Sequence, residues 1–238
     1  MEFKEILAEK GPEAGLSFTD LQLEQFNIYY KLLVETNKQL NLTALTSPED
    51  VAVKHIIDSL LAFEDKFFTG RSLIDVGSGA GFPGIPLKIY CPSLKVVLLD
   101  SLAKRLKFLE TVIAELKLQE ISCEHMRAED AGQNKLYRGQ FDLVTARAVA
   151  KLAVLAELCL PLVKVGGFFI ALKGSKYQTE LEESARSLKV LGGELVQAEP
   201  VTLPGLDDGR AIIRIKKIKP TPEAYPRKAG LPAKKPIL

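Results

Sequence analysis

The sequence predicts an α/β fold in which a mostly parallel β-sheet is covered by helices. Three observations predict it: apolar strand-like runs alternate with amphipathic segments from residue 71 onward, a glycine-rich turn follows the first run, and no strand pattern occurs before residue 70. Alternation of strands and helices is typical of a parallel sheet. We expect a helical N-terminal extension packed on the core over 1–70, an α/β domain over 71–219 and a basic, proline-rich tail over 220–238.

The N-terminal extension contains two predicted helices. Residues 20–38 carry apolar side chains at helical spacing, and Asp20 is the expected N-cap. The Ser-Pro pair at 47–48 predicts the start of a second helix, which runs to about residue 62. His55 and Asp58 lie three residues apart near one face of that helix. We interpret them as a structural or interdomain contact rather than as a catalytic pair.

Seven segments are expected as strands, and helices are expected between most of them. The last two strands have no helix between them, which predicts an antiparallel arrangement at one end of the sheet. Five prolines in the last 19 residues exclude regular structure there. The expected strands are 71–76, 94–100, 121–128, 141–148, 165–173, 193–203 and 210–217, and the main helices between them are 101–116, 151–160 and 176–191.

The glycine-rich turn, "LIDVGSGAGFPGIPL" at 73–87, fits two ligand-binding motifs. From Gly79 to Gly84 it matches G-x-G-x-x-G, the dinucleotide fingerprint, and Asp100 ends the next strand where a ribose-binding acid is expected. From Asp75 it also matches an acid followed by G-x-G-x-G, beginning at Gly77, the pattern of S-adenosylmethionine (SAM) methyltransferases. A carboxylate at the mouth of the loop would repel a diphosphate but tolerate the sulfonium and ammonium of SAM, so Asp75 favours SAM.

Other candidate residues follow the later strands. A backbone group of Ala128 and the carboxylate of Glu129 stand where they could read an adenine edge, although an acidic helix N-cap explains the same residues equally well. Arg147 ends the fourth strand, where ligands bind in open parallel sheets. Its guanidinium suits a phosphate or the Hoogsteen edge of guanine, and the alternative is an ion pair with a surface acid. Lys173 is a weaker candidate for the same polyanion.

Composition excludes several classes of protein. The three cysteines are widely spaced, so no disulfide framework or metal-binding pair is visible, and we expect no metal. No apolar run approaches the roughly 20 residues of a membrane span, and the N-terminus is charged, so we expect a cytoplasmic protein without a secretion signal. Nothing in the sequence requires a dimer, and a monomer is expected.

Basic residues gather at the C-terminus. Residues 216–238 contain seven Lys or Arg against one acid, Glu223. This charge suggests a polyanionic partner, with a solvated, poorly ordered tail as the alternative. No N/D-P-P-Y or Pro-Cys sequence is present, so methylation of an exocyclic amine or of C5 of a pyrimidine is unsupported. N7 of guanine carries an in-plane lone pair and would need no general base.

Six segments resemble the RsmG (GidB) family: "NLTAL" at 41–45, "HIIDSL" at 55–60, "DVGSGAGFPGIPL" at 75–87, "LLDSLAKRLKFL" at 98–109, "FDLVTARAV" at 141–149 and "YPRKAGLPAKKPI" at 225–237. The resemblance runs from about residue 20 to the end. It implies a bacterial enzyme that uses SAM to methylate N7 of a guanine, position 527 in the 530 loop of 16S rRNA, either as RNA or within a small-subunit particle.

The resemblance also implies a Rossmann-like SAM-dependent methyltransferase fold and cofactor contacts at Gly77, Phe82, Ala128–Glu129 and Arg147. Together with Asp75, Gly79 and Asp100 from the motifs, these are the expected cofactor-binding residues. No general base is assigned, and Arg147 is the candidate for positioning the substrate. The alternatives are a non-catalytic SAM- or RNA-binding module and an NAD-dependent oxidoreductase.

Overall fold

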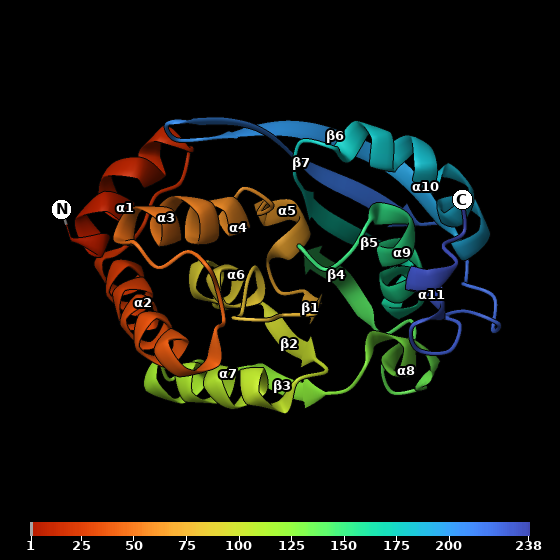
Figure 1. Cartoon of the computed structure of the whole chain (residues 1–238), viewed down its shortest axis with the longest axis horizontal. Helices are drawn as coiled ribbons and strands as arrows, with labels where there is room; N and C mark the ends of the chain where they lie inside the picture. The colour runs from red at the N-terminus through yellow and green to blue at the C-terminus, as the bar shows by residue number, and fades with distance from the viewer. Residues whose placement is uncertain (1) are drawn as a thin grey trace.

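The computed structural model describes residues 2–238 and contains a seven-stranded sheet in the order β3-β2-β1-β4-β5-β7-β6 (Figure 1). Strands β1 to β5 run parallel, whereas β7 is antiparallel to both β5 and β6. The predicted fold class and the antiparallel end are confirmed. The strands are β1 Ser72–Val76, β2 Lys95–Asp100, β3 Ile121–His125, β4 Phe141–Arg147, β5 Val163–Lys173, β6 Gly193–Leu203 and β7 Leu206–Lys217.

Helices cover both faces of the sheet (Figure 1). On one face lie α6 (Gly84–Tyr90) and α7 (Ala103–Glu115), and on the other lie α8 (Ala128–Gln133), α9 (Leu152–Cys159) and α10 (Tyr177–Leu191). Side chains alternate along each strand, so Leu73 joins the hydrophobic cluster of the first face and Ile74 that of the second. β1 and β4 are neighbours in the sheet, but the helices that follow them, α6 and α9, lie on opposite faces. Open α/β sheets bind ligands at such a switch point, at the carboxyl ends of the two strands.

The N-terminal residues are helical, as predicted. Thr19, rather than Asp20, caps α2: its side chain accepts from the amide of Gln22, and the Gln22 side chain accepts from the Thr19 amide. Ser47 caps α3 as expected. The helices are α1 Phe3–Glu13, α2 Asp20–Leu40, α3 Pro48–Val51, the π-helix η1 Ala52–Ile57, α4 Asp58–Leu60 and α5 Asp65–Phe68.

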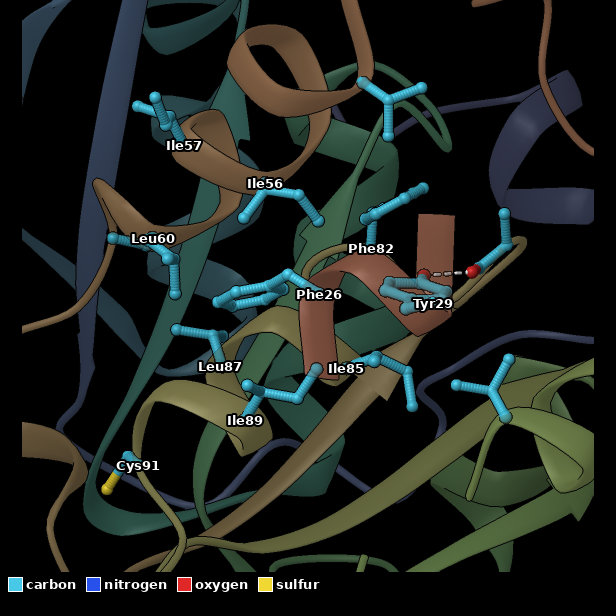
Figure 2. Close-up of a cluster of buried hydrophobic side chains, with 14 of the residues drawn as sticks. Phe26, Tyr29, Ile56, Ile57, Leu60, Phe82, Ile85, Leu87, Ile89 and Cys91 are labelled. Atoms are coloured by element: carbon cyan, nitrogen blue, oxygen red, sulfur yellow. Dashed lines mark hydrogen bonds between the residues drawn. The ribbon is translucent and has the colours of Figure 1, made fainter. Parts of the chain in front are cut away.

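The extension shares the core of the α/β domain. Figure 2 shows Phe26 and Tyr29 of α2 among Ile85 and Leu87 of α6, with side chains of η1 and α4 on the other side. These buried residues belong to one continuous cluster, so the extension supports the helix that follows the glycine loop. The division into 1–70, 71–219 and 220–238 stays a prediction.

The tail is folded onto the second face of the sheet. Arg138 donates hydrogen bonds to the carbonyls of Thr221 and Tyr225, and Arg227 contacts the buried carboxylate of Glu157 through three nitrogens. One helical turn, α11 (Leu231–Lys234), has a proline in its first turn, where no amide donor is needed. The expectation of no regular structure is therefore wrong for this turn, and the poorly ordered tail is excluded.

Candidate functional site

A cavity of about 470 Å³ opens at the carboxyl ends of β1, β2 and β4. Its size is typical of a site for a small ligand or cofactor. The sequence-predicted residues Gly77, Gly79, Phe82, Asp100, Ala128, Glu129 and Arg147 all lie on its wall, and Asp75 does not. We call it the cofactor cavity.

The glycine loop follows β1 directly and is tied to its neighbours by backbone contacts. The amides of Gly77 and Ser78 donate to the Leu99 carbonyl of β2 at 2.8 and 3.1 Å. Gly77 has a φ of +72°, and a Cβ there would lie 2.8 Å from a methyl group of Val149, so this position requires glycine. On the other side, the hydroxyl of Tyr29 donates to the Ala80 carbonyl (Figure 2).

Asp75 lies behind the loop rather than at its mouth. Its side chain is fully buried, and its two oxygens accept from the Gly84 amide at 3.1 Å and from the Thr145 hydroxyl at 3.2 Å. Burial raises the pKa of this carboxyl to about 6. The expected direct contact between Asp75 and the cofactor is therefore corrected: the carboxylate positions the loop and the start of α6.

Among the described residues, no amide in the first turn of α6 is left as a free donor, and Asp75 accounts for one of them. The Gly84 amide is bonded to Asp75, the Ile85 amide donates to the Gly81 carbonyl at 2.7 Å, and Pro86 has no amide hydrogen. Dinucleotide sites hold their diphosphate with free amides at this helix end. The structure thus disfavours a diphosphate, because the acid occupies a donor and prolines remove others.

Asp100 stands at the end of β2 on the cavity wall. One carboxylate oxygen accepts from the Gly79 amide and the other from the Leu102 amide, both at 2.9 Å, while the Arg105 guanidinium lies 3.4 Å away. A carboxylate offers about four lone-pair sites, so Asp100 keeps acceptor capacity for ribose hydroxyls. The side chain therefore has a fixed orientation and remaining acceptors on the cavity wall.

Ala128 and Glu129 begin α8 on the far side of the cavity. The cap position is Arg127, so the interpretation of an acidic N-cap is wrong, although Glu129 and Asp130 do lie in the first turn. The Glu129 carboxylate accepts from the amide of Gly230 at 2.9 Å. This bond connects the C-terminal tail to the cofactor cavity.

Arg147 joins the extension to the sheet. Its Nη1 donates to Asp58 at 2.6 Å and to the Lys54 carbonyl at 3.1 Å, and its Nη2 lies 3.2 Å from Nδ1 of His55. Its guanidinium carbon lies 4.9 Å from the centre of the Phe82 ring, which stacks on His55. The alternative interpretation, an ion pair of Arg147 with an acid, is confirmed, but its partner Asp58 is buried rather than on the surface.

His55 and Asp58 make the structural contact that the sequence suggested, each through Arg147. Burial, and then the charge of Arg147, lower the pKa of His55 to about 4, so the ring is neutral at pH 7. Its Nε2 lies 2.8 Å from the Thr43 hydroxyl. His55 is therefore held by contacts at both ring nitrogens.

A family model described as "GidB: rRNA small subunit methyltransferase G" matches residues 22–204. The chain belongs to the GidB family. A relative from Lactobacillus helveticus, "Ribosomal RNA small subunit methyltransferase G", is 55% identical over 222 residues, which cover 92% of each chain. This membership confirms the resemblance found in the six sequence segments.

Solved structures resemble the GidB-family chain in fold. A SAM-dependent methyltransferase from Aquifex aeolicus aligns with a TM-score of 0.56 at 15% identity, covering 74% of this chain and 96% of its own. A ribosomal protein L11 methylase from Lactobacillus delbrueckii subsp. bulgaricus aligns with a TM-score of 0.53 at 16% identity, covering 70% and 79%. At these identities the similarity concerns the fold, because one fold carries many substrates.

Some residues of the site were not predicted from the sequence. Leu42 and Thr43, from the loop after α2, and Arg105 and Met126 also line the cofactor cavity. Leu42 and Thr43 lie in the family segment "NLTAL", which is the sequence feature that could have indicated them. Lys173, the weaker candidate, lies outside this cavity, donates to the Ala150 carbonyl and pairs with Glu180 at 2.7 Å.

The groups on the cavity wall that could take a proton are already engaged. His55 is neutral and contacted at both ring nitrogens, and the carboxylates of Asp100 and Glu129 accept from backbone amides. The cavity is thus arranged to bind and orient a ligand rather than to remove a proton.

Within residues 2–238, no cluster of three metal-ligating side chains occurs, and no helix is long and apolar enough to cross a bilayer.

Proposed function

We propose that this GidB-family protein methylates N7 of a guanine in 16S rRNA, position 527 in the 530 loop, with SAM as the methyl donor. One observation supports the choice of ligand. Asp100 lies beside the glycine loop, and the first amides of the helix after this loop, α6, already donate to Asp75 and to the loop backbone. Such a site suits a nucleoside without a diphosphate. Family membership supports the choice of rRNA as substrate.

In this proposal different residues on the wall of the cofactor cavity bind the ribose, the adenine and the methionine part of SAM. Asp100 accepts from the ribose hydroxyls, and the Ala128–Glu129 pair lies at the adenine. The backbone of Gly77, Gly79 and Phe82 approaches the methionine part, because the glycines leave no side chains in the way.

The chemistry needs no general base. Bound SAM would supply a methyl group to the N7 lone pair: the methyl–sulfur bond would break with its electron pair going to sulfur, and no proton would need to leave. The protein contributes orientation and exclusion of water. Neutral His55 adds no charge beside a base that becomes cationic.

In this proposal Arg147 does not donate hydrogen bonds to both N7 and O6 of the guanine. A guanidinium hydrogen-bonded to N7 would occupy the lone pair that must accept the methyl group. In the structure Arg147 is fixed by Asp58, the Lys54 carbonyl and the Phe82 ring. We therefore assign Arg147 to positioning, by shaping the cavity wall and by donating to O6 of the base.

The partner in this proposal is 16S rRNA or a small-subunit particle, met by a cytoplasmic monomer. The folded tail exposes Lys228, Lys234 and Lys235. Lysines on a docked segment suit contacts with RNA phosphates, which are sequence-independent and salt-sensitive.

A transfer assay tests the proposed function. The protein is incubated with radiolabelled SAM and small-subunit RNA from a strain that lacks the modification, and the product is mapped to a nucleotide. We expect label at guanine N7. Tight SAM binding without transfer, while a control methyltransferase labels its own RNA, would favour the binding-module alternative, and NADH binding with hydride transfer would favour the oxidoreductase.

A further inference from the structure

A second cavity, of about 460 Å³, adjoins the cofactor cavity. The two share His55, Arg147 and Ala148 as a common wall. The second cavity is bounded by the carboxyl ends of β4 and β5, by the middle of β7, by residues of η1 and α4, and by the start of α10. Of the expected cofactor-binding residues only Arg147 lines it, and Lys173, the weaker candidate for a polyanion, lines it as well. A ligand bound there would lie directly beside the ligand of the first cavity.

The shared wall is locally irregular. Ala148 adopts a φ of +56°, a left-handed conformation that costs energy for a residue with a side chain. Lys54 and His55 come from the π-helix η1, a form that is rare and frequent at functional sites. The Asp58 carboxylate bridges Arg147 of β4 and Arg210 of β7, at 2.6 and 2.9 Å. Strain and buried charge thus converge where the two cavities meet.

The walls of the second cavity are basic. They carry five basic side chains against two acidic ones: Lys54, Arg147, Lys173, Lys176 and Arg210 against Asp58 and Glu180. Lys176 is exposed and forms no ion pair within residues 2–238. Arg210 uses Nη1 for Asp58 and Nε for Asp208, which leaves its Nη2 without a protein partner in the described part of the chain. These two side chains have capacity for an anion.

We propose that the second cavity binds the target nucleotide of the RNA, with Lys176 and Arg210 contacting its phosphates while the base reaches the cofactor cavity across the wall formed by His55, Arg147 and Ala148. The inference rests on the proposed function and extends it to a substrate site. An RNA nucleotide fits because it combines an anionic phosphodiester with a flat base, and a site beside SAM is where a base must lie to accept the methyl group.

The test compares Lys176, which immediately precedes α10, with Lys189 within it. Lys176 lies at the second cavity, and Lys189 is exposed 13 residues later, about 20 Å along the axis. We measure binding to unmodified 16S rRNA at several salt concentrations for K176A, K189A and R210K. Melting temperature and SAM affinity serve as controls for folding and for the cofactor cavity.

For K176A we expect about tenfold weaker RNA binding and a salt-dependence slope smaller by about 0.7, the value for one phosphate contact on a single strand. K189A should match the wild type, SAM affinity should not change, and KM for RNA should rise more than kcat falls. R210K retains the positive charge but loses the separate guanidinium nitrogens that let Arg210 bind Asp58, Asp208 and a phosphate at once. We expect weaker RNA binding by this variant and an unchanged SAM affinity.

Equal RNA binding by K176A and K189A would overturn the proposal, as would a fall in SAM affinity equal to the fall in RNA affinity. Failure of the proposed function looks different. In that case the wild-type protein itself would transfer no methyl group to the RNA, whatever the variants do.

Discussion

The Asp75 carboxylate accepts the amide hydrogen of Gly84 at 3.1 Å, so the acid that ends the apolar run of β1 fixes the first residue of α6. The same side chain accepts from the Thr145 hydroxyl of β4. It thereby connects the glycine loop, the following helix and the neighbouring strand. Ligand choice at this loop depends on which amides remain free, and Asp75 removes one of them.

Replacing Asp75 by alanine is expected to lower the free energy of unfolding by about 2–3 kcal/mol, because a buried amide and a buried hydroxyl lose their acceptor. SAM affinity should fall as well, since the loop loses an anchor. Asp142 gives a matched control: its carboxylate accepts from the Ser72 amide at the opposite end of β4. D142A should reduce stability in urea unfolding but leave SAM affinity in calorimetry intact. Similar losses of SAM affinity in both variants would contradict the assignment.

Asp100→Ala is expected to weaken SAM binding by about 1–3 kcal/mol, the usual cost of removing a charged acceptor from a hydrogen bond. The exposed acid Asp130, in the first turn of α8, is the control, and D130A should bind SAM as the wild type does. Calorimetry measures both affinities, and the melting temperature shows whether each variant folds. An unchanged affinity of D100A would remove Asp100 from the cofactor site.

Tyr29→Phe deletes the hydroxyl that bonds the Ala80 carbonyl and leaves the aromatic ring in the core. The free energy of unfolding should fall by about 1–2 kcal/mol, because the buried carbonyl loses its donor. The neighbouring Tyr30 donates to the Thr46 carbonyl in an exposed position, so Y30F should cost less than about 0.5 kcal/mol. Denaturant unfolding of the two variants tests the difference, and equal costs would mean that the bond to the glycine loop is unimportant.

The stability of the protein should depend on pH through His55. Its pKa is lowered to about 4 in the folded state from 6.5, so its contribution is fully present above pH 6.5 and is lost as the pH falls toward 4. The loss is at most about 3–4 kcal/mol for a pKa that falls from 6.5 to about 4. Asp75, whose pKa is raised to about 6, contributes in the opposite direction over part of the same range, so the variant is compared with the wild type at each pH. The free energy of unfolding of H55N should rise relative to that of the wild type as the pH falls from 6.5 to 4, whereas replacing the exposed His125 by asparagine should give no such trend. The same slope in H55N and wild type would refute the assignment.

The sequence predicts the strands and the loop well because these depend on local patterns. The run "LKVVLLD" becomes β2 within one residue, and Asp100 lies on the cavity wall as expected. The position of Asp75 could not be derived this way, since it depends on how β1 pairs with β4 and on where α6 begins. A one-residue shift separates the expected cap Asp20 from the real cap Thr19.

Long-range contacts account for the rest of what the sequence did not predict. Arg147 and Asp58 are 89 residues apart, and Glu129 and Gly230 are 101 residues apart, so no local pattern pairs them. The charge of the tail was visible, but its docking through Arg227 and Glu157 depends on a buried acid of α9 that reads as an ordinary helical residue. The π-helix η1 has no sequence signal that distinguishes it from the α-helix that was expected.

The most direct test of the ligand assignment is a calorimetric titration of the same protein sample with SAM and, separately, with NADH. The occupied amides at the start of α6 predict saturable binding of SAM at one site and no measurable heat from NADH. Binding of NADH with no binding of SAM would contradict the central claim that this cavity accepts a nucleoside methyl donor and not a diphosphate.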